Sequence, residues 1–141
     1  MSKQYDEYSA GIIVYNQEED IKYLLLYHGG EYWNFPKGKM EKEETEIETA
    51  LRELSEETNI KQVEIVDGFE ESYSYSFKSR GKNIKKLVKM YLGRYLGGTI
   101  ILSHEHLDYT WYSYDKAMSI LNYSNIKSQL TAADTYLKSL T

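Results

Sequence analysis

Residues 38–60, GKMEKEETEIETALRELSEETNI, carry the most regular pattern in the chain, a glycine-led loop followed by a short helix. Thr45 can cap this helix, because Glu48 lies three positions later and can return a bond to the backbone N–H of the cap. Apolar residues then recur at i, i+3, i+4 and i+7 and predict one buried stripe, formed by Ile47, Ala50, Leu51 and Leu54. One side of the helix is therefore expected to pack against a core.

Another side of this helix gathers acids. Glu53, Glu56 and Glu57 fall at i, i+3 and i+4, so their carboxylates share one arc. Like charges at this spacing repel one another, and hard oxygen ligands select magnesium, calcium or manganese. A solvated acidic helix would carry the same residues without a cation. Carboxylates that hold a metal instead indicate phosphate chemistry, since substrate phosphates commonly complete the shell of magnesium.

The complete pattern distinguishes these alternatives. It consists of G, five residues, E, seven residues, R-E-L-S-E-E, two residues and I, with Gly38, Glu44 and Arg52 at its fixed positions. This arrangement resembles the box of the Nudix hydrolase family in eight defined positions. It departs in one, because Asn59 stands where the family has a glycine. Asparagine tolerates the left-handed conformation at a helix end better than other residues except glycine, so we expect an intact site.

Length and composition narrow the class of protein. A chain of 141 residues is expected to form one domain, residues 1–141, with its own core. The absence of cysteine excludes disulfides, thiolate metal sites and a cysteine nucleophile. The N-terminus is polar, and no apolar run approaches the roughly 20 residues of a membrane span. We therefore expect a monomeric cytoplasmic protein with no membrane partner.

The net charge of −5 is unevenly distributed. Residues 40–60 hold eight acids and two bases, a local charge of −6 that leaves +1 for the rest of the chain. Residues 77–91 carry six basic residues and no acid. A negative cluster beside a positive segment suits a polyanion bridged to a metal better than duplex DNA, which requires a broad basic face.

The remainder of the chain predicts strands and two closing helices. Strands are expected at residues 7–15, 21–28, 61–67, 69–77 and 85–96. The continuous apolar run from Tyr23 to Tyr27 predicts a strand buried on both faces. Ser113 and Ser124 are expected to cap the helices, the second of which has an apolar side of Ile126, Leu130, Ala133 and Leu137. Strands on both sides of a helix predict an α/β sandwich around a mixed β-sheet, and the family resemblance implies the same Nudix-type α/β/α sandwich.

Basic and aromatic residues outside the box are candidates for substrate binding. Pro36 fixes the backbone ahead of Lys37, so we predict that this lysine contacts a substrate phosphate; a solvated lysine is the alternative. Tyr75, beside a basic turn, and Tyr109, in the loop after Glu105, could stack on a nucleobase, which contributes about 1–3 kcal/mol. Three lysines of the basic segment could neutralise a phosphate chain unless the hairpin is only solvated: Lys82, Lys86 and Lys89.

Further segments resemble one branch of the Nudix family, the asymmetric diadenosine tetraphosphate hydrolases. They are SAGIIVY (9–15), LLLY (24–27), W-x-x-P-K-G (33–38), Gly68-Phe69 and SHEHLDYTWY (103–112). The resemblance implies water attack on a polyphosphate that joins two nucleosides, with ATP and AMP released from diadenosine tetraphosphate. It also implies Mg²⁺, with Mn²⁺ as the alternative.

Roles carried over by position follow from this resemblance. It implies metal ligands at Gly38, Glu53, Glu56 and Glu57. Arg52 would orient Glu53 or its neighbours, Lys37 and Lys86 would hold phosphates, and Tyr75 and Tyr109 would sandwich an adenine. The branch commonly has a histidine just before the tryptophan, and Tyr32 replaces it here, so a phosphate contact from this position is not expected to carry over.

The catalytic base and the substrate class each leave alternatives. The attacking water must give its proton to a carboxylate, which is either a box glutamate, such as Glu53 or Glu56, or Glu105 from the distant loop. Within enzymes, the alternative is a pyrophosphohydrolase of RNA 5′ ends or nucleoside triphosphates. Outside enzymes, it is a nucleotide-binding domain that has lost its chemistry, although the three box carboxylates are all present.

Overall fold

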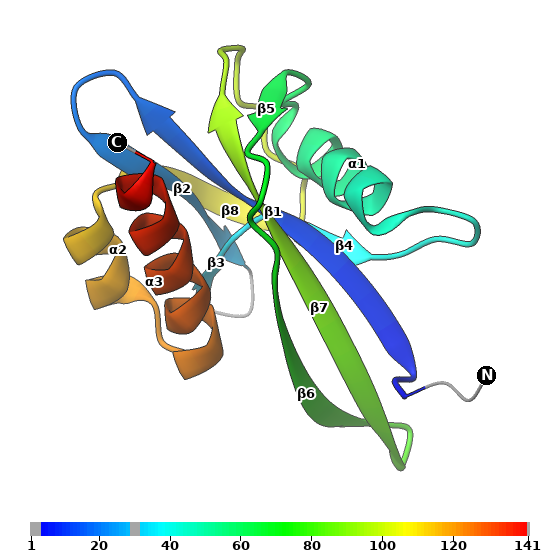
Figure 1. Ribbon diagram of the computed structural model, residues 1–141. Helices are drawn as coiled ribbons and strands as arrows, with labels where there is room; N and C mark the ends of the chain where they lie inside the picture. Colours follow the sequence, from blue (N-terminus) through cyan, green and yellow to red (C-terminus); the bar gives the residue numbers. More distant parts are fainter. Residues whose placement is uncertain (1–3, 29–31, 141) are drawn as a thin grey trace.

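A mixed β-sheet organises the computed structural model, which describes residues 4–28 and 32–140 (Figure 1). Its strands are β1 (Glu7–Gln17), β2 (Ile21–His28), β3 (Tyr32–Asn34), β4 (Lys37–Lys39), β5 (Val63–Ile65), β6 (Glu71–Ser79), β7 (Lys82–Tyr95) and β8 (His106–Tyr112). Its helices are α1 (Glu46–Thr58), α2 (Tyr114–Ile120) and α3 (Ser124–Ser139).

Strand β1 is central to the sheet. It pairs in parallel with β7, from Glu7 opposite Lys86 to Tyr15 opposite Arg94, and antiparallel with β2 and β4. The sheet runs in the order β3-β2-β1-β7-β5, with β8 on β2 and β6 on β7. Helix α1 covers one face, and α2 and α3 cover the other (Figure 1). The expected α/β/α sandwich around a mixed sheet is therefore confirmed.

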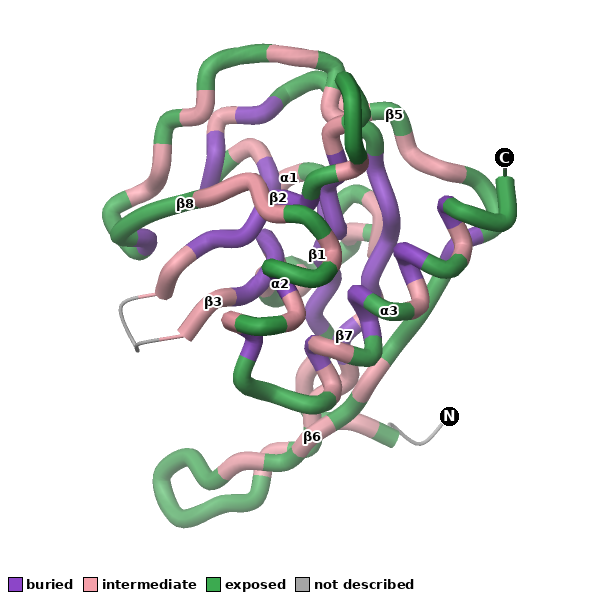
Figure 2. The backbone as a smooth tube through the Cα atoms, turned by 90° about the vertical axis from the view of Figure 1, so that its left-hand side faces the viewer, coloured by how far each residue is buried: buried purple, intermediate pink, exposed green. Residues whose placement is uncertain are grey.

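Two apolar cores lie on opposite faces of this sheet. Side chains alternate along β1, so that Ile12 and Val14 pack beneath α1 whereas Ile13 packs beneath α2 and α3. In β2, residues 23–26 are all fully buried, which confirms the strand expected to be buried on both faces (Figure 2). Among the described residues, no helix has both the length and the hydropathy that crossing a bilayer requires.

Helix α1 begins and ends as the sequence indicates. Thr45 and Glu48 form the reciprocal capping box, and Asn59 ends the helix in the left-handed conformation with φ 66°. Leu51 is a correction, because it is 38% exposed whereas Ala50 and Leu54 are fully buried. The buried side passes through Ala50, Leu54 and Glu57, so Leu51 lies about 100° away around the helix. The carboxyl group of Glu57 therefore lies on the buried side of α1, to which the apolar pattern had assigned Leu51.

The remaining differences concern the ends of elements. Tyr123, not Ser124, is the N-cap of α3, and it makes no side-chain capping bond. Ser124 is already helical, and its carbonyl accepts a bond from the Ser128 hydroxyl at 3.0 Å. The expected lead-in loop contains the short strands β3 and β4, while residues 29–31 lie outside the described residues. Tyr109 lies on β8 rather than in a loop, because β8 pairs with β2 along its whole length.

Candidate active site

A hollow lined by carboxylates lies where α1, β4 and the loop before β8 meet. We call it the acidic pocket. The predicted Glu105 joins the box glutamates here, although about fifty residues of chain separate them. The complete lining is His28, Lys37, Gly38, Lys39, Glu53, Glu56, Glu57, Ser103, Glu105 and His106. All predicted metal ligands and all three candidate bases, Glu53, Glu56 and Glu105, therefore line one space.

Two glycines allow the backbone of this site to close. A Cβ at Gly38 would overlap the carboxylate of Glu53, so only glycine lets α1 approach β4 this closely. A Cβ at Gly11, on β1, would overlap the carbonyl oxygen of Pro36. That same carbonyl accepts a bond from the Ile12 N–H at 3.1 Å. The loop before the box is thus fixed to the central strand, as the proline predicts.

Arg52 connects two carboxylates of α1 to Glu44, which precedes the helix, and to β4. Its Nε donates to Glu44 Oε2 at 2.6 Å, and its Nη1 donates to Glu53 Oε1 and to Glu56 Oε1, each at 2.9 Å. Nη2 donates to the Lys39 carbonyl of β4 at 3.0 Å. The hydrogen bonds from Arg52 are the main cause that lowers the pKa of Glu44 to about 2. The predicted orientation of Glu53 by Arg52 is present, and it extends to two further glutamates.

Glu57 is the buried carboxyl of the pocket. Burial and the neighbouring Glu53 raise its pKa far above the ordinary range. Its Oε1 has no hydrogen-bond partner among the described residues. A buried carboxyl of this kind suits a divalent cation, which would stabilise the ionised form. Within residues 4–28 and 32–140, no three His, Asp or Glu side chains converge as a preformed cation site, and Arg52 bonds both Glu53 and Glu56. A cation would therefore compete with Arg52 for their oxygens.

Lys37 lines the acidic pocket and a second hollow beside it. Burial lowers the pKa of Lys37 to about 8, and the charge of Lys86 acts in the same direction, against Glu57 and Glu53. Lys86 itself pairs with Glu7 at 3.7 Å. The two lysines expected to hold phosphates are therefore close enough to influence each other.

The other two lysines of the basic segment lie elsewhere. Lys89 pairs with Glu46 at 2.7 Å and with Glu70 at 3.6 Å, because it points to the other face of β7. Lys82 lies at the tip of the β6–β7 hairpin, opposite Ser79. Of this set, Lys86 is the lysine whose charge acts on the pKa of Lys37, although it does not line either pocket.

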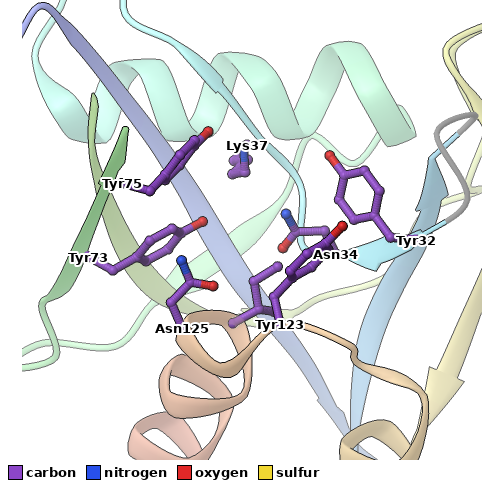
Figure 3. Close-up of a pocket in the computed structure, with 8 residues that line it drawn as sticks. Tyr32, Asn34, Lys37, Tyr73, Tyr75, Tyr123 and Asn125 are labelled. Atoms are coloured by element: carbon purple, nitrogen blue, oxygen red, sulfur yellow. The ribbon is translucent and has the colours of Figure 1, made fainter. Parts of the chain in front are cut away.

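The second hollow, which we call the tyrosine pocket, has a volume of about 330 Å³. Tyr73 and Tyr75 of β6 form one wall, and Tyr32 and Tyr123 lie across from them (Figure 3). The rings of Tyr32 and Tyr123 meet edge to face, with centroids 5.6 Å apart. The complete lining is Tyr32, Asn34, Lys37, Tyr73, Tyr75, Tyr123, Asn125 and Ile126.

The predicted pairing of Tyr75 with Tyr109 is wrong. Tyr109 lies opposite Leu26, whose side chain belongs to the core beneath α1. Tyr75 packs against the core on the other face, beneath α2 and α3. Of the other tyrosines that line the pocket with Tyr75, Tyr73 could have been found from the alternation along β6. Tyr123 gives no such signal, because its position depends on how α3 returns to the sheet.

Comparisons with known proteins identify the family. The family model described as NUDIX domain matches residues 6–133. The chain is 30% identical to the asymmetrical bis(5′-nucleosyl)-tetraphosphatase of Mus musculus, over 92% of this chain and 94% of that protein. It is 32% identical to an RNA pyrophosphohydrolase of Campylobacter jejuni subsp. doylei, over 66% of this chain and 64% of that protein.

A solved structure gives the same result in three dimensions. The crystal structure of a C. elegans Ap4A hydrolase binary complex matches with a TM-score of 0.84 and 30% identity. The match covers 94% of this chain and 98% of that one. The family model and the similarity to these hydrolases lead to one assignment: the chain belongs to the Nudix hydrolase family.

Proposed function

We propose that the protein hydrolyses dinucleoside polyphosphates, with diadenosine tetraphosphate cleaved to ATP and AMP in the presence of Mg²⁺ or Mn²⁺. One observation carries this proposal: Lys37 lines both the acidic pocket and the tyrosine pocket. A single ligand can therefore stack a base between tyrosines and extend its phosphates toward the carboxylates. The similarity to asymmetrical tetraphosphatases supports the same substrate class.

The proposed base site is the tyrosine pocket. An adenine would stack against Tyr75 or Tyr73 from one side and Tyr123 or Tyr32 from the other, which replaces the sandwich expected with Tyr109. The amides of Asn34 and Asn125 line the same space and offer donors and acceptors to the edge of a base. Most of the affinity would come from stacking, which accepts any base.

In the proposed reaction, the oxygen of a water attacks a phosphorus of the chain and the bond from that phosphorus to a bridging oxygen breaks. Lys37 and Lys86 neutralise the phosphate charge, and Arg52 keeps Glu53 and Glu56 in place. A divalent cation held by Glu53, Glu56, Glu57 and the Gly38 backbone would lower the pKa of a bound water and polarise the phosphoryl oxygens. The proton of the water passes to a carboxylate of the acidic pocket.

Two carboxylates compete for that proton, Glu56 and Glu105, since both line the acidic pocket. Comparing Glu56→Gln with Glu105→Gln separates them, because glutamine keeps the shape of the side chain and loses the base. We expect substitution of the true base to lower turnover by at least a hundredfold. A tenfold or smaller effect at Glu105 would exclude it as the sole base.

A panel of substrates tests the proposed function. Dinucleoside polyphosphates, nucleoside triphosphates and 5′-triphosphate RNA are each incubated with Mg²⁺, and the products are identified. ATP plus AMP, formed from diadenosine tetraphosphate with the highest kcat/KM in the panel, is the expected result. Nucleotide binding without any cation-dependent release of phosphate would overturn it in favour of a binding domain.

The second candidate is a pyrophosphohydrolase of RNA 5′ ends. The β6–β7 hairpin favours it, because this hairpin extends beyond the start of β1 and ends in exposed basic residues (Figure 1). Lys78, Arg80 and Lys82 have no ion pair within the described ranges. An RNA strand would be long enough to reach this tip, whereas a dinucleoside polyphosphate would extend only over the two pockets. In the panel, a preference for 5′-triphosphate RNA would support this candidate.

A further inference from the structure

A buried histidine without a role in the proposed reaction lies against Glu57. His106 Nε2 is 3.3 Å from Glu57 Oε1, and the two side chains are only 2% and 6% exposed. Neither atom has a hydrogen-bond partner among the described residues, and their mutual approach is close without meeting the geometry of a hydrogen bond. Leaving either group unpaired away from water would cost about 1–3 kcal/mol, so the two atoms are the natural partners of each other.

The loop that leads to His106, the first residue of β8, is fixed to the end of α1. The Ser103 N–H donates to the Glu57 carbonyl at 3.1 Å, and the Ile101 N–H donates to the Thr58 carbonyl at 2.9 Å. The His106 N–H then donates to the Ser103 carbonyl at 3.1 Å. Backbone hydrogen bonds therefore fix the position of His106 relative to Glu57, independently of the contact between the two side chains.

Ser103 contacts the other ring nitrogen of His106. Its Oγ lies 3.0 Å from His106 Nδ1. When the serine hydroxyl donates to Nδ1, the N–H is at Nε2 and faces the Glu57 carboxylate. In this tautomer the two unpaired atoms, Nε2 and Oε1, face each other as donor and acceptor at 3.3 Å.

A second histidine supports the ring of His106. The His28 ring meets it edge to face, with centroids 4.5 Å apart, and Tyr32 stacks on His28 at 4.7 Å with an interplanar angle of 3°. Burial lowers the pKa of His28 to about 4, so no positive charge enters this cluster at neutral pH. The His106 ring is thus confined on one side by His28 and on another by Ser103.

We propose that His106 is a positioning residue, whose Nε2–H holds Oε1 of Glu57 so that the carboxylate keeps one orientation in the acidic pocket. This inference rests on the proposed function, because it concerns the same pocket. A carboxylate held in one orientation binds a divalent cation more tightly than one free to rotate, since less freedom is lost on binding. The His28 ring and the Ser103 hydroxyl contact the His106 ring, and the Ser103 backbone N–H bonds the Glu57 carbonyl.

The test measures Mn²⁺ affinity without substrate, from the electron paramagnetic resonance of the free ion. His106→Phe fills the space and removes the donor, and we expect roughly tenfold weaker binding. His106→Gln restores a donor near the position of Nε2 and should come within about threefold of the unaltered protein. His104→Phe is the matched control, since His104 is an exposed histidine of the same loop and should leave the affinity unchanged.

Two results would overturn the positioning role. One is a His106→Phe variant whose Mn²⁺ affinity lies within twofold of the unaltered protein. The other is a glutamine variant that binds as weakly as the phenylalanine variant, which would indicate packing alone. If thermal unfolding shows that His106→Phe is not folded, Ser103→Ala takes its place, because Ser103 is only half-buried. A loss of about threefold supports the proposal, and no loss contradicts it.

Kinetics with diadenosine tetraphosphate then test the positioning role of His106 separately from the proposed function. We expect His106→Phe to have a lower turnover than the unaltered protein at limiting Mn²⁺ and an equal turnover at saturating Mn²⁺. Its KM for the nucleotide should be unchanged. A chain that binds Mn²⁺ with the expected order of variants but hydrolyses no dinucleotide would contradict the proposed substrate only. Absence of Mn²⁺ binding in the unaltered protein would contradict both.

Discussion

The acidic pocket and the tyrosine pocket share Lys37 but are constructed differently. In the acidic pocket, Arg52 bonds three glutamates and the β4 backbone, and Gly38 leaves no room even for a Cβ. In the tyrosine pocket, rings contact other rings and the apolar core, and two of them stand on β6, whose one strand partner in the described chain is β7. Chemistry requires groups fixed to within about half an ångström, whereas stacking tolerates small movements. The difference in rigidity thus corresponds to the difference in task.

The largest effect is expected on the acidic side. Glu53→Gln removes one carboxylate charge from the pocket and weakens a bond from Arg52, so turnover should fall on the order of a thousandfold. Adenosine binding, followed by tyrosine fluorescence, should remain within twofold, because the base site is separate. Glu43→Gln, an exposed acid of the same stretch, is the control. A loss of turnover below tenfold would remove Glu53 from the mechanism.

Lys37→Ala is expected to damage both pockets together. Charge-assisted hydrogen bonds contribute about 1.5–3 kcal/mol, so kcat/KM for diadenosine tetraphosphate should fall by roughly 10- to 100-fold. Lys82→Ala, at the hairpin tip, should have little effect on the same substrate. If Lys37→Ala left both turnover and KM unchanged, the two pockets would not be joined by this residue.

On the tyrosine side, Tyr75→Ala should raise KM about tenfold with turnover within twofold, because only stacking is lost. Tyr75→Phe keeps the ring and should behave nearly as the unaltered protein. Tyr109→Ala provides a matched comparison, since this tyrosine lies on the opposite face of the sheet. An equal rise in KM at Tyr109 would show that the base binds elsewhere.

The smallest effect expected is an exchange of protons in the acidic pocket. The raised pKa of Glu57 means that its carboxyl is protonated at neutral pH without a cation. A cation binds the ionised form, so affinity for Mn²⁺ should rise with pH, by at most tenfold per unit, and about one proton should be released. Calorimetry in two buffers of different ionisation enthalpy counts that proton. Glu57→Gln should release none, and equal release would assign the proton to another group.

The sequence anticipates the acidic pocket better than the tyrosine pocket, for a physical reason. Arg52, Glu53, Glu56 and Glu57 belong to one helix that Asn59 ends, and the fixed period of this helix determines which side chains meet. Even there, Leu51 was wrongly expected to be buried, because Glu57 takes part of the buried side. Spacing alone does not reveal that a cavity for phosphate chemistry requires a carboxyl in the core.

The tyrosine pocket draws on three distant segments, and no local period relates them. Tyr32 comes from β3, Tyr75 from β6 and Tyr123 from the turn before α3. Their meeting depends on the parallel pairing of β1 with β7, which fixes where β6 lies relative to β3. The contact of His106 with Glu57 was missed for the same reason, since it depends on where the loop before β8 crosses the end of α1.

Strand β6 is hydrogen-bonded to a neighbouring strand along one edge in the described chain, so it should separate from the sheet more readily than β1 does. Strand β1 is bonded on both sides, whereas the outer edge of β6 has no strand partner in the described chain. Its amide hydrogens should exchange with solvent sooner than those of the β1–β7 pairing, and a brief detachment of β6 would carry Tyr73 and Tyr75 away together. Nucleotide recognition can then be lost and regained, or remodelled in descendants, while the hydrolytic machinery remains assembled.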